Sequence, residues 1–557
     1  PVLKDPLYHT VAVGVIVQCP FTGVLQALVA DLFGQVMVQD FRGRIKPMHT
    51  LNRELMRKIY GSETIGDWTA DQVVLSMYAS KQDWYAYPLI TLGKHEKIGE
   101  LINVTGKKAG YRDFFDQNGQ YKLKAEVSRA NNLEPIDRGI FEKQLLKVDE
   151  RVNILGMAFS GTMLKVVPVE GDANNTWVSE HAHGTMPSEI AKKFFSSYKN
   201  ALHEATHKNN PQIANQLLTE LIAFQKKAGS EVMPVDSKIS AEILLNNSKV
   251  FSRLALTYVV LGIIFLVLLF VSVFNPNLRL EKLGYFFMAM IAIGFLFHTV
   301  GLGLRWYVSG RAPWSNGYET MIYIAWTTVI GGLIFSRKSL GGLAATMIQS
   351  GIMLLVAMMS FLDPEITPLV PVLKSYWLTI HVSLEAGSYG FLMLGALIGL
   401  INLVLIATLT ENSLPRAKRM VKELSYISEL NIMVGLVMIS IGTYLGGVWA
   451  NESWGRYWGW DAKETWALVS ILVYAFILHM RLIPKLGGLF AFNFATLFGL
   501  SSVIMTYYGV NYYLSGLHSY AAGDPVPIPQ WVYITVIGLA IVSIIAYLQK
   551  RRFKLIL

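Results

Sequence analysis

Five of the 13 tryptophans in this chain lie in one short segment, residues 449–466, together with Tyr457. Gly455 and Gly459 interrupt helical periodicity there and let the backbone lie close to a flat partner. Tryptophan also forms belts at membrane surfaces, but a belt spreads over many helix ends. We therefore expect a platform for a large planar apolar ligand, formed by Trp449, Trp454, Trp458, Trp460 and Trp466.

Charged side chains stand among these rings. Arg456 and Lys463 could meet carboxylates on the edge of such a ligand, because charge-assisted hydrogen bonds to carboxylates are strong. Asp461 and Glu464 are either organisers of the segment or acid–base groups, and the sequence gives no basis for choosing between these roles.

Four of the 11 histidines lie in the apolar half of the chain: His298, His381, His479 and His518. His381 stands four residues after Trp377, one turn inside its predicted helix, and His518 follows the end of another. With the topology derived below, both are level with the tryptophan-rich segment. Two imidazoles beside an aromatic platform predict axial ligands to a haem iron.

His479 lies near the opposite end of its predicted helix, just before Arg481, and cannot reach the outer pair. It is either an interfacial histidine or the ligand of a second haem station near the inner side. His298 is a poor candidate for the second ligand of that station, because it lies near the outer end of its predicted helix and His479 lies near the inner end. The partner of His479 is then expected outside this sequence.

The elements that must position these residues are membrane helices. Only 16% of the residues are charged and the mean hydropathy is +0.38, whereas soluble proteins carry roughly 25% charged residues. A helix needs about 20 apolar residues to cross the hydrocarbon core. A single segment in lipid must be helical, because only a helix satisfies all of its backbone hydrogen bonds internally. Nine stretches qualify, at approximately 254–274, 284–304, 319–335, 341–361, 377–408, 430–448, 465–483, 489–514 and 531–548.

The basic residues set the orientation. With residues 1–248 outside, the inside loops carry many more Lys and Arg than the outside loops, as the positive-inside rule requires. The inside set is Arg279, Lys282, Arg337, Lys338, Arg416, Lys418, Arg419, Lys422, Arg481, Lys485, Lys550, Arg551, Arg552 and Lys554; the outside set is Arg305, Arg311, Lys374, Arg456 and Lys463. The C-terminus is then inside. The net charge of +10 is thus a topology signal, and we expect no nucleic-acid partner.

Residues 1–248 are predicted to form an α+β extracytoplasmic domain, and residues 249–557 the transmembrane domain. Ile140–Val152 and Ile190–His203 have helical spacing, and Met163–Val169 resembles a strand. Residues 11–30 are long enough for an extra membrane helix, but we favour a buried strand followed by a loop. The start at Pro1 indicates a fragment or processed form of something longer.

Two further patterns concern metals and redox chemistry. Cys19 is the only cysteine, which excludes a disulfide framework, a CxxC pair and a CxxCH haem-attachment motif within this chain. His203, Glu204 and His207 spell HExxH, the zinc signature of metalloproteases. This motif ends a polar helix without the usual downstream ligands, so we interpret it, like His181 and His183, as ordinary surface residues.

The segment WGRYWGWDAKETW resembles the tryptophan-rich WWD signature of haem-handling proteins. With the surroundings of His381 (WLTIH), His479 (LHMR) and His518 (GLHSY), and with RWYVSGRAPWSNGYET, it resembles the CcsBA family, the fused CcsB–CcsA (ResB–ResC) cytochrome c synthases of System II. Residues 38–55 (VQDFRGRIKPMHTLNREL) resemble the periplasmic region of the same proteins.

The resemblance implies a holocytochrome c synthase of the bacterial inner membrane, with a periplasmic soluble domain. It would carry haem b outward and attach it covalently to the CxxCH motif of apocytochrome c, with thiol-reducing proteins as further partners. The resemblance implies that His381 and His518 bind the outer haem and that His479 binds haem within the membrane. We name His381, His518 and Asp461 as the candidate catalytic residues. The remaining membrane histidine of the family belongs to N-terminal CcsB-like helices that we do not find here.

Two other functions stay open. A haem exporter without ligation activity would use the same two stations. A b-type electron-transfer protein would also bind haem between two histidines, although such pairs usually face each other inside a four-helix bundle. A redox protein retains its haem, whereas a synthase releases it covalently bound to another protein.

Overall fold

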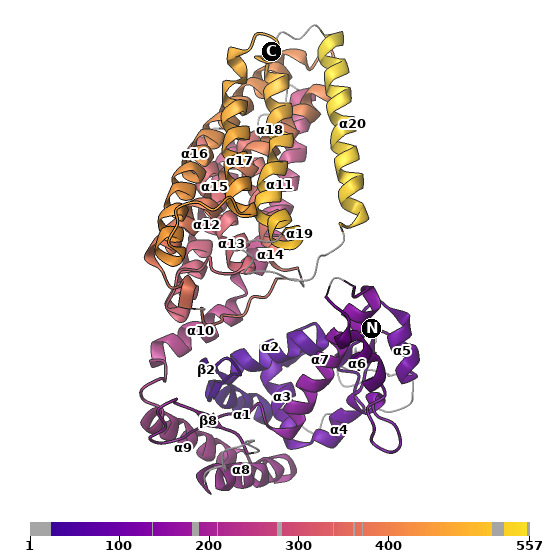
Figure 1. Ribbon diagram of the computed structural model, residues 1–557, viewed down its shortest axis with the longest axis vertical. Helices are drawn as coiled ribbons and strands as arrows, with labels where there is room; N and C mark the ends of the chain where they lie inside the picture. Colours follow the sequence, from indigo (N-terminus) through magenta and orange to yellow (C-terminus); the bar gives the residue numbers. More distant parts are fainter. Residues whose placement is uncertain are drawn as a thin grey trace. The chain divides into compact units, whose positions relative to one another are not determined.

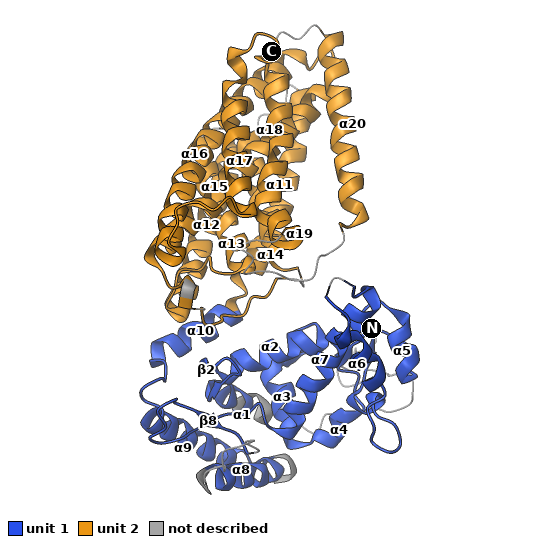
Figure 2. Cartoon of the chain, viewed as in Figure 1, with its two compact units in different colours: residues 1–247 blue, residues 248–557 orange. Residues whose placement is uncertain are grey.

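The computed structural model describes residues 24–135, 137–180, 189–208, 210–275, 281–337, 339–359, 362–369, 371–514 and 528–553. The chain divides into two compact units, residues 1–247 and 248–557 (Figure 2). The predicted fold class is confirmed, because helices long and apolar enough to span a membrane follow an N-terminal region of mixed helices and strands.

The first unit contains short antiparallel strand pairs among helices (Figure 1). Its elements are α1 (Val24–Gln35), β1 (Met37–Gln39), β2 (Ile45–Pro47), α2 (Met48–Tyr60), β3 (Thr64–Ile65), β4 (Trp68–Thr69), α3 (Ala70–Ala79), α4 (Lys81–Tyr85), β5 (Ile90–Thr91), α5 (Glu96–Ile102), β6 (Lys108–Ala109), η1 (Tyr111–Phe114), α6 (Lys124–Asn132), α7 (Ile140–Ser160), β7 (Val167–Pro168), β8 (Trp177–Val178), α8 (Glu189–Lys208), α9 (Gln212–Ala228) and α10 (Asp236–Ser248). The pairs are β1–β2, β3–β4, β5–β6 and β7–β8.

Two apolar clusters form the core of this unit. One gathers side chains of α2, α3 and α7 together with the buried Trp84 of α4 and Phe114 of η1. The other packs α1 against α8 and α9 through residues such as Phe33 and Phe195. Gln225 on α9 is fully buried and bonds the backbone N–H and C=O of Met37 at 3.1 and 2.8 Å, so one side chain satisfies backbone groups that β1 leaves unpaired.

The polar residues of the segment 38–55 are paired inside the unit. The Asp71 carboxylate on α3 contacts Nδ1 of His49 at 2.5 Å and accepts a hydrogen bond from Asn52 at 2.8 Å. Glu242 on α10 accepts hydrogen bonds from Arg44 at 2.6 Å and from Thr50 at 2.9 Å. These polar residues therefore hold α2, α3 and α10 together.

Two local predictions in this unit were wrong. Residues from Val24 onward are helical, not strand and loop, and α1 buries Val29 and Phe33 in the core of the unit. Residues 1–23 lie outside the described part, so the beginning of the 11–30 stretch is not described. The strand predicted at Met163–Val169 is reduced to β7, because tight backbone turns precede it.

The second unit is a helical bundle. Its elements are α11 (Val250–Phe274), α12 (Glu281–Ser309), α13 (Gly317–Phe335), α14 (Leu340–Ala357), η2 (Pro371–Leu373), α15 (Tyr376–Ala407), α16 (Leu414–Trp454), α17 (Ala462–His479), η3 (Met480–Leu482), α18 (Leu489–Ile504), the π-helical turn η4 (Met505–Gly509), α19 (Val510–Tyr513) and α20 (Gln530–Arg552). In the described part of the chain, nine helical stretches meet the length and hydropathy of a membrane span, as predicted.

Helix α15 is the most enclosed span and packs on α13, α14, α16, α18 and α20. Its longest contact is with α16, where glycines let the two backbones approach closely. A Cβ on Gly435 would lie 2.6 Å from Leu392, and one on Gly395 would lie 2.9 Å from Ile432. This small-residue seam fixes α15 and α16 against each other along their length.

Buried amides add polar contacts to this core. The Asn402 amide donates to Asn493 Oδ1 at 2.8 Å, and the Asn493 amide donates to Ser425 Oγ at 2.7 Å. The three residues come from α15, α18 and α16. Such contacts are favourable in lipid because it offers no other partner to a buried amide.

Candidate functional site

The tryptophan-rich segment is partly helical. Helix α16 continues to Trp454, so only residues 455–461 form a loop before α17 begins at Ala462. The predicted loop 449–466 was therefore too long. We call the end of the bundle where α16 ends and α15 begins the tryptophan-rich end.

The short loop is tightly folded. Gly455 caps α16 with φ +72°, and Trp460 adopts φ +57°, a left-handed conformation that side chains rarely take. The guanidinium of Arg456 lies where a side chain on Gly459 would project, so a larger residue at position 459 would displace this guanidinium. Strained backbone of this kind is concentrated at functional sites.

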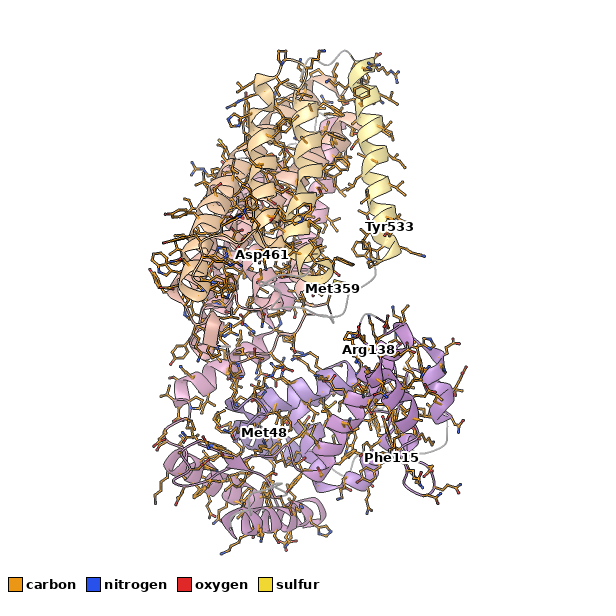
Figure 3. All side chains as sticks on the ribbon, in the orientation of Figure 1. Met48, Phe115, Arg138, Met359, Asp461 and Tyr533 are labelled. Atoms are coloured by element: carbon orange, nitrogen blue, oxygen red, sulfur yellow. The ribbon has the colours of Figure 1, made fainter. Side chains whose placement is uncertain are left out.

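Asp461 is the N-cap of α17 (labelled in Figure 3). Its carboxylate accepts the Glu464 N–H at 2.9 Å, while Glu464 accepts the N–H groups of Gly459 at 2.7 Å and Asp461 at 3.3 Å. Negative charge is also favourable at a helix N-terminus. Of the two roles left open by the sequence, these contacts support that of organiser of the loop.

The five tryptophans differ in exposure. Trp460 is 70% exposed, whereas Trp449 is 1% exposed and packs edge-on against Trp454 at 4.8 Å between ring centres. Trp454, Trp458 and Trp466 are partly buried. The indole N–H of Trp458 is buried and donates to no acceptor among the described residues. Trp449 thus packs inside the bundle, and Trp460 presents its ring to the surroundings.

His381 lies beside this segment. Its Nδ1 is 2.7 Å from the carbonyl oxygen of Gly442 on α16, and its ring packs on Gly446, one turn further along. The adjacent Gly447 faces the loop, because a Cβ there would lie 2.9 Å from the carbonyl oxygen of Tyr457. The structure therefore brings His381 and the tryptophan-rich loop onto the same stretch of α16.

A polar cluster lies one turn further along α15 from His381. Glu385 accepts a hydrogen bond from Thr443 Oγ1 at 2.8 Å and another from the Tyr389 hydroxyl. The positive charge of Lys463 interacts electrostatically with Glu385. The Nζ atom of Lys463 lies 3.4 Å from Asn511 Oδ1. Asn511 follows the π-helical turn η4, a distortion often found at functional sites. Lys463 is thus occupied inside the bundle.

Arg456 differs from Lys463 in this respect. Its side chain is partly buried, and no hydrogen bond or ion pair links it to any other residue that the structure describes. A guanidinium presents five donors in a planar fork that matches a carboxylate. Of the two residues predicted to bind a carboxylate, Arg456 is therefore the one whose N–H donors could bind a ligand carboxylate.

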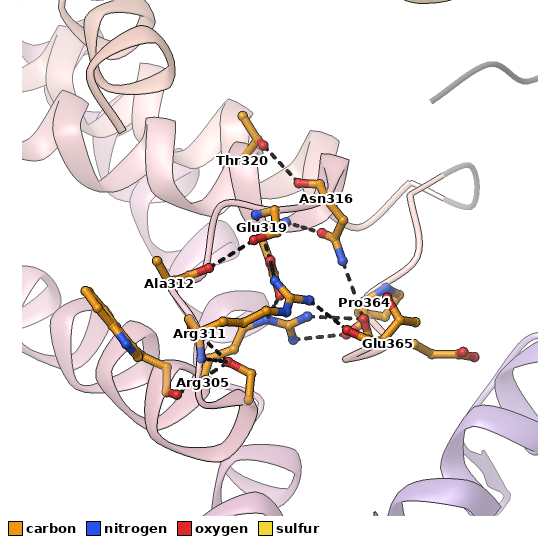
Figure 4. A network of polar contacts seen from close by, with 12 residues as sticks. Arg305, Arg311, Ala312, Asn316, Glu319, Thr320, Pro364 and Glu365 are labelled. Carbon is orange, nitrogen blue, oxygen red and sulfur yellow. Dashed lines mark hydrogen bonds and ion pairs between the residues drawn. The ribbon is translucent and has the colours of Figure 1, made fainter. Parts of the chain in front are cut away.

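The segment 305–320 forms a separate polar network (Figure 4). Glu319 is fully buried and bonds Arg305 at 2.9 Å and Arg311 at 2.8 Å. Arg305 also donates to the carbonyl oxygens of Pro364 and Glu365, and Trp314 Nε1 donates to the carbonyl oxygen of Thr379 on α15 at 3.1 Å. This network joins the ends of α12 and α13 to the first turn of the helix that carries His381.

The other histidines are placed differently. His479 is the last residue of α17, is exposed, and lies with Nδ1 2.7 Å from the carbonyl oxygen of Ala475. It is therefore at the far end of α17 from Asp461. His298 is fully buried and bonds the Ile322 carbonyl at 3.0 Å, which is a packing contact between α12 and α13. His518 lies outside the described residues.

The structure does not test the HExxH pattern as a metal site, because the side chain of His207 is outside the part it describes. His203 is exposed on α8. His181 and His183, like the side chain of His207, are outside the part that the structure describes. Among the residues the structure describes, no three His, Cys, Asp or Glu side chains are grouped to hold a metal ion.

Comparison with known proteins shows the family to which this chain belongs. Residues 314–518 match the family model described as "Cytochrome C assembly protein". The chain is 35% identical over 244 residues to the cytochrome c biogenesis protein CcsA of Guillardia theta, covering 40% of this chain and 81% of that protein. The chain belongs to the cytochrome c assembly (CcsA/ResC) family.

A second CcsA, from Synechococcus sp. strain CC9605, is 36% identical over 262 residues, 42% of this chain and 85% of its own. Protein NrfI of Wolinella succinogenes is 44% identical over 521 residues, 93% of this chain. This chain spans only 57% of the length of NrfI. The protein is thus a multi-pass membrane protein of cytochrome c biogenesis, from a family that handles haem.

Three residues around His381 were not identified from the sequence. Glu385 carried a signal, since an ionisable residue inside a membrane span is a functional candidate by default. Gly442 and Gly446 carried none, because glycine is frequent in membrane helices and only the packing of α15 on α16 shows which glycines face the histidine.

Proposed function

We propose that this protein binds haem b at the tryptophan-rich end, with His381 and His518 as axial ligands, and attaches it to the CxxCH motif of apocytochrome c. The observation that carries this proposal is the contact of His381 with Gly442 and Gly446, next to the loop of residues 455–461. A histidine that donates one ring N–H to a backbone carbonyl is oriented as metal-binding histidines usually are.

The geometry of His381 supports iron ligation through Nε2. When Nδ1 donates its proton to the Gly442 carbonyl, the lone pair of the neutral ring is on Nε2. Neutral imidazole is a common axial ligand of haem iron. His518 belongs to the segment between α19 and α20 and is proposed as the opposite ligand on the strength of its sequence position alone.

The loop supplies contacts that suit the porphyrin. Indole rings can pack on its apolar face, and Arg456 can hold a propionate carboxylate in a forked arrangement. Trp458 offers one further buried N–H donor. Lys463 interacts with Asn511 and with the charge of Glu385, so the proposal assigns propionate binding to Arg456 and the support of the loop to Lys463.

The covalent step needs positioning more than an enzyme nucleophile. Each cysteine thiol of CxxCH adds across a haem vinyl group: sulfur bonds the carbon next to the ring, and the hydrogen reaches the terminal carbon. No oxidant or reductant is consumed in this addition. The motif's histidine replaces one protein ligand, and a rigidly held porphyrin raises the effective concentration of the reacting groups.

The proposal also assigns sidedness and an inner station. The tryptophan-rich end faces the periplasm of a bacterial inner membrane, with residues 1–248 on the same side and the C-terminus in the cytoplasm, as the basic residues indicate. His479, at the opposite end of α17, would hold haem before its transfer outward, together with a second ligand from a CcsB-like segment.

Co-expression with an apocytochrome c tests the function. We expect the acceptor to gain covalent haem, detected by haem staining after denaturing electrophoresis, and to gain none when its CxxCH cysteines are replaced by serine. His381→Gly and His518→Gly should weaken haem binding, and added imidazole should restore it. Haem that stays on the membrane protein while the acceptor remains empty would support an exporter or an electron-transfer protein instead.

Sidedness is tested separately in a cysteine-free background. After Cys19→Ser, single cysteines at Tyr457 and at Lys485 are labelled in intact cells with a thiol reagent that does not cross the inner membrane. Tyr457 is 63% exposed and should react, whereas Lys485 should react only after the membrane is opened. The reverse pattern would overturn the orientation.

A further inference from the structure

The imidazole of His381 lies on a bare stretch of α16. A Cβ on Gly446 would lie 2.7 Å from His381 Cε1, 2.8 Å from Nδ1 and 3.2 Å from Nε2. Real Cβ atoms essentially never approach other heavy atoms within 3.0 Å, so any side chain at residue 446 would force the imidazole to move. The ring can take its place only because residue 446 is glycine.

Gly442 supplies the second constraint. Its carbonyl oxygen lies 2.7 Å from His381 Nδ1, although an α-helical carbonyl normally serves the N–H four residues later. A carbonyl oxygen has two lone pairs and can accept both hydrogen bonds. The close approach of the helices makes this bond possible, because a Cβ on Gly442 would lie 3.2 Å from the backbone nitrogen of Glu385.

We propose that Gly442 and Gly446 are positioning residues that fix the tautomer and the ring orientation of His381 for iron ligation. This inference rests on the proposed function, in which His381 binds haem iron. Gly446 sets the plane of the ring, and the Gly442 carbonyl holds the proton on Nδ1 and so keeps the lone pair on Nε2.

The arrangement also affects the iron. A hydrogen bond from the non-ligating ring nitrogen makes the imidazole a more basic ligand, which favours the ferric over the ferrous state. Loss of the bond should therefore raise the reduction potential of the bound haem. A residue that only packs the helices together would change stability without moving this potential.

Gly446→Ala is the direct test, and Gly387→Ala is its matched control. Gly387 lies on α15, and a Cβ there would lie 2.7 Å from the flexible end of Met438 on α16 and 3.5 and 3.6 Å from Thr327 and Tyr323 on α13, so His381 is not among its three nearest neighbours. We expect Gly446→Ala to lower haem affinity about tenfold or more, as loss of such outer contacts does at metal sites. It should also raise the midpoint potential, while Gly387→Ala stays within twofold of wild type and keeps its potential.

A double variant covers the case in which Gly446→Ala folds poorly. His381→Gly removes the ring that the new methyl group would meet, so His381→Gly/Gly446→Ala should regain most of the melting temperature that Gly446→Ala alone loses. This readout needs no haem. If the melting temperature is not regained, or if Gly446→Ala matches Gly387→Ala in affinity and potential, the inference is wrong.

The two proposals fail in different ways. If His381→Gly lowers haem binding and imidazole restores it, but Gly446→Ala behaves as wild type, the haem site stands and the positioning role falls. If His381→Gly leaves haem spectra unchanged, the proposed function falls, and the glycines are then only packing residues for a histidine that does not bind iron.

Discussion

The guanidinium of Arg456 occupies the space into which a side chain on Gly459 would project. Arginine and glycine are three residues apart in a loop that Glu464 closes by accepting the Gly459 N–H. The guanidinium is thereby held against backbone while its donors bond no other described residue. Holding a charged group in place before the ligand arrives reduces the entropy lost on binding.

Arg456→Gln should remove a contact to a haem propionate. We expect haem affinity to fall by about tenfold or more, since hydrogen bonds to charged groups contribute roughly 1.5–3 kcal/mol. Affinity for haem dimethyl ester, which lacks the carboxylate charge, should change little. Titrations followed in the Soret region measure both ligands with both proteins.

Arg456→Lys is the control for charge alone. Lysine keeps the positive charge but loses the planar fork, so its affinity should fall between those of wild type and Arg456→Gln. Equal losses for haem and its dimethyl ester in Arg456→Gln would show that the residue shapes the loop and does not bind the propionate.

Asp461→Asn distinguishes a capping role from acid–base catalysis. Asparagine is as good an N-cap as aspartate but cannot exchange a proton near neutral pH, whereas alanine costs roughly 0.5–2 kcal/mol as an N-cap. We expect Asp461→Asn to retain most ligation activity and Asp461→Ala to lower the melting temperature. Covalent haem on a co-expressed acceptor and thermal unfolding in detergent measure the two effects; an inactive but stable Asp461→Asn protein would restore the catalytic assignment.

Much of the membrane half could be predicted from the sequence, because apolar runs of helical length have few alternatives in lipid. The spans and the proximity of His381 to the tryptophan-rich segment follow from hydropathy and charge. The end of α16 does not, because polar residues such as Asn451 and Glu452 look like loop yet continue the helix to Trp454. Propensity is a weak guide wherever tertiary packing decides.

The contacts of the site residues could not be predicted from the sequence for a related reason. Lys463 and Arg456 both looked like carboxylate partners, and only the positions of Asn511 and Glu385 in the folded bundle show that Lys463 is occupied. In the first unit, apolar residues that alternate at 11–17 favoured a strand followed by a loop for the whole of 11–30, whereas the helix α1 begins at Val24. Short apolar runs are ambiguous in this way, and their partners decide between the two structures.

Lys463 and Glu385 should be energetically coupled. Each single change, Lys463→Met or Glu385→Gln, removes a charge that acts on the other residue inside the bundle. The double variant should therefore lose less stability than the sum of the single losses, with a coupling of about 1 kcal/mol, within the range for residues of one polar network. Thermal unfolding of the four proteins gives this value. Additive losses would mean that the two charges do not interact.

Glu319 should be among the most sensitive polar residues of the bundle. Its side chain is fully buried between Arg305 and Arg311, so Glu319→Gln leaves two guanidinium groups without a counter-charge. Breaking a buried pair in this way costs about 3–5 kcal/mol, which should lower the melting temperature strongly and expose residues 362–369 to proteases.

Arg481→Gln is the matched control for this prediction, since Arg481 also bonds a glutamate, Glu429, at 2.7 Å but is 68% exposed at its side chain. Exposed ion pairs contribute about 0–1 kcal/mol, so this variant should unfold close to wild type. Because the network of Glu319 also holds Trp314 against the first turn of α15, Glu319→Gln should weaken haem binding as well. Equal stability of the two variants would contradict the assigned role of the buried network.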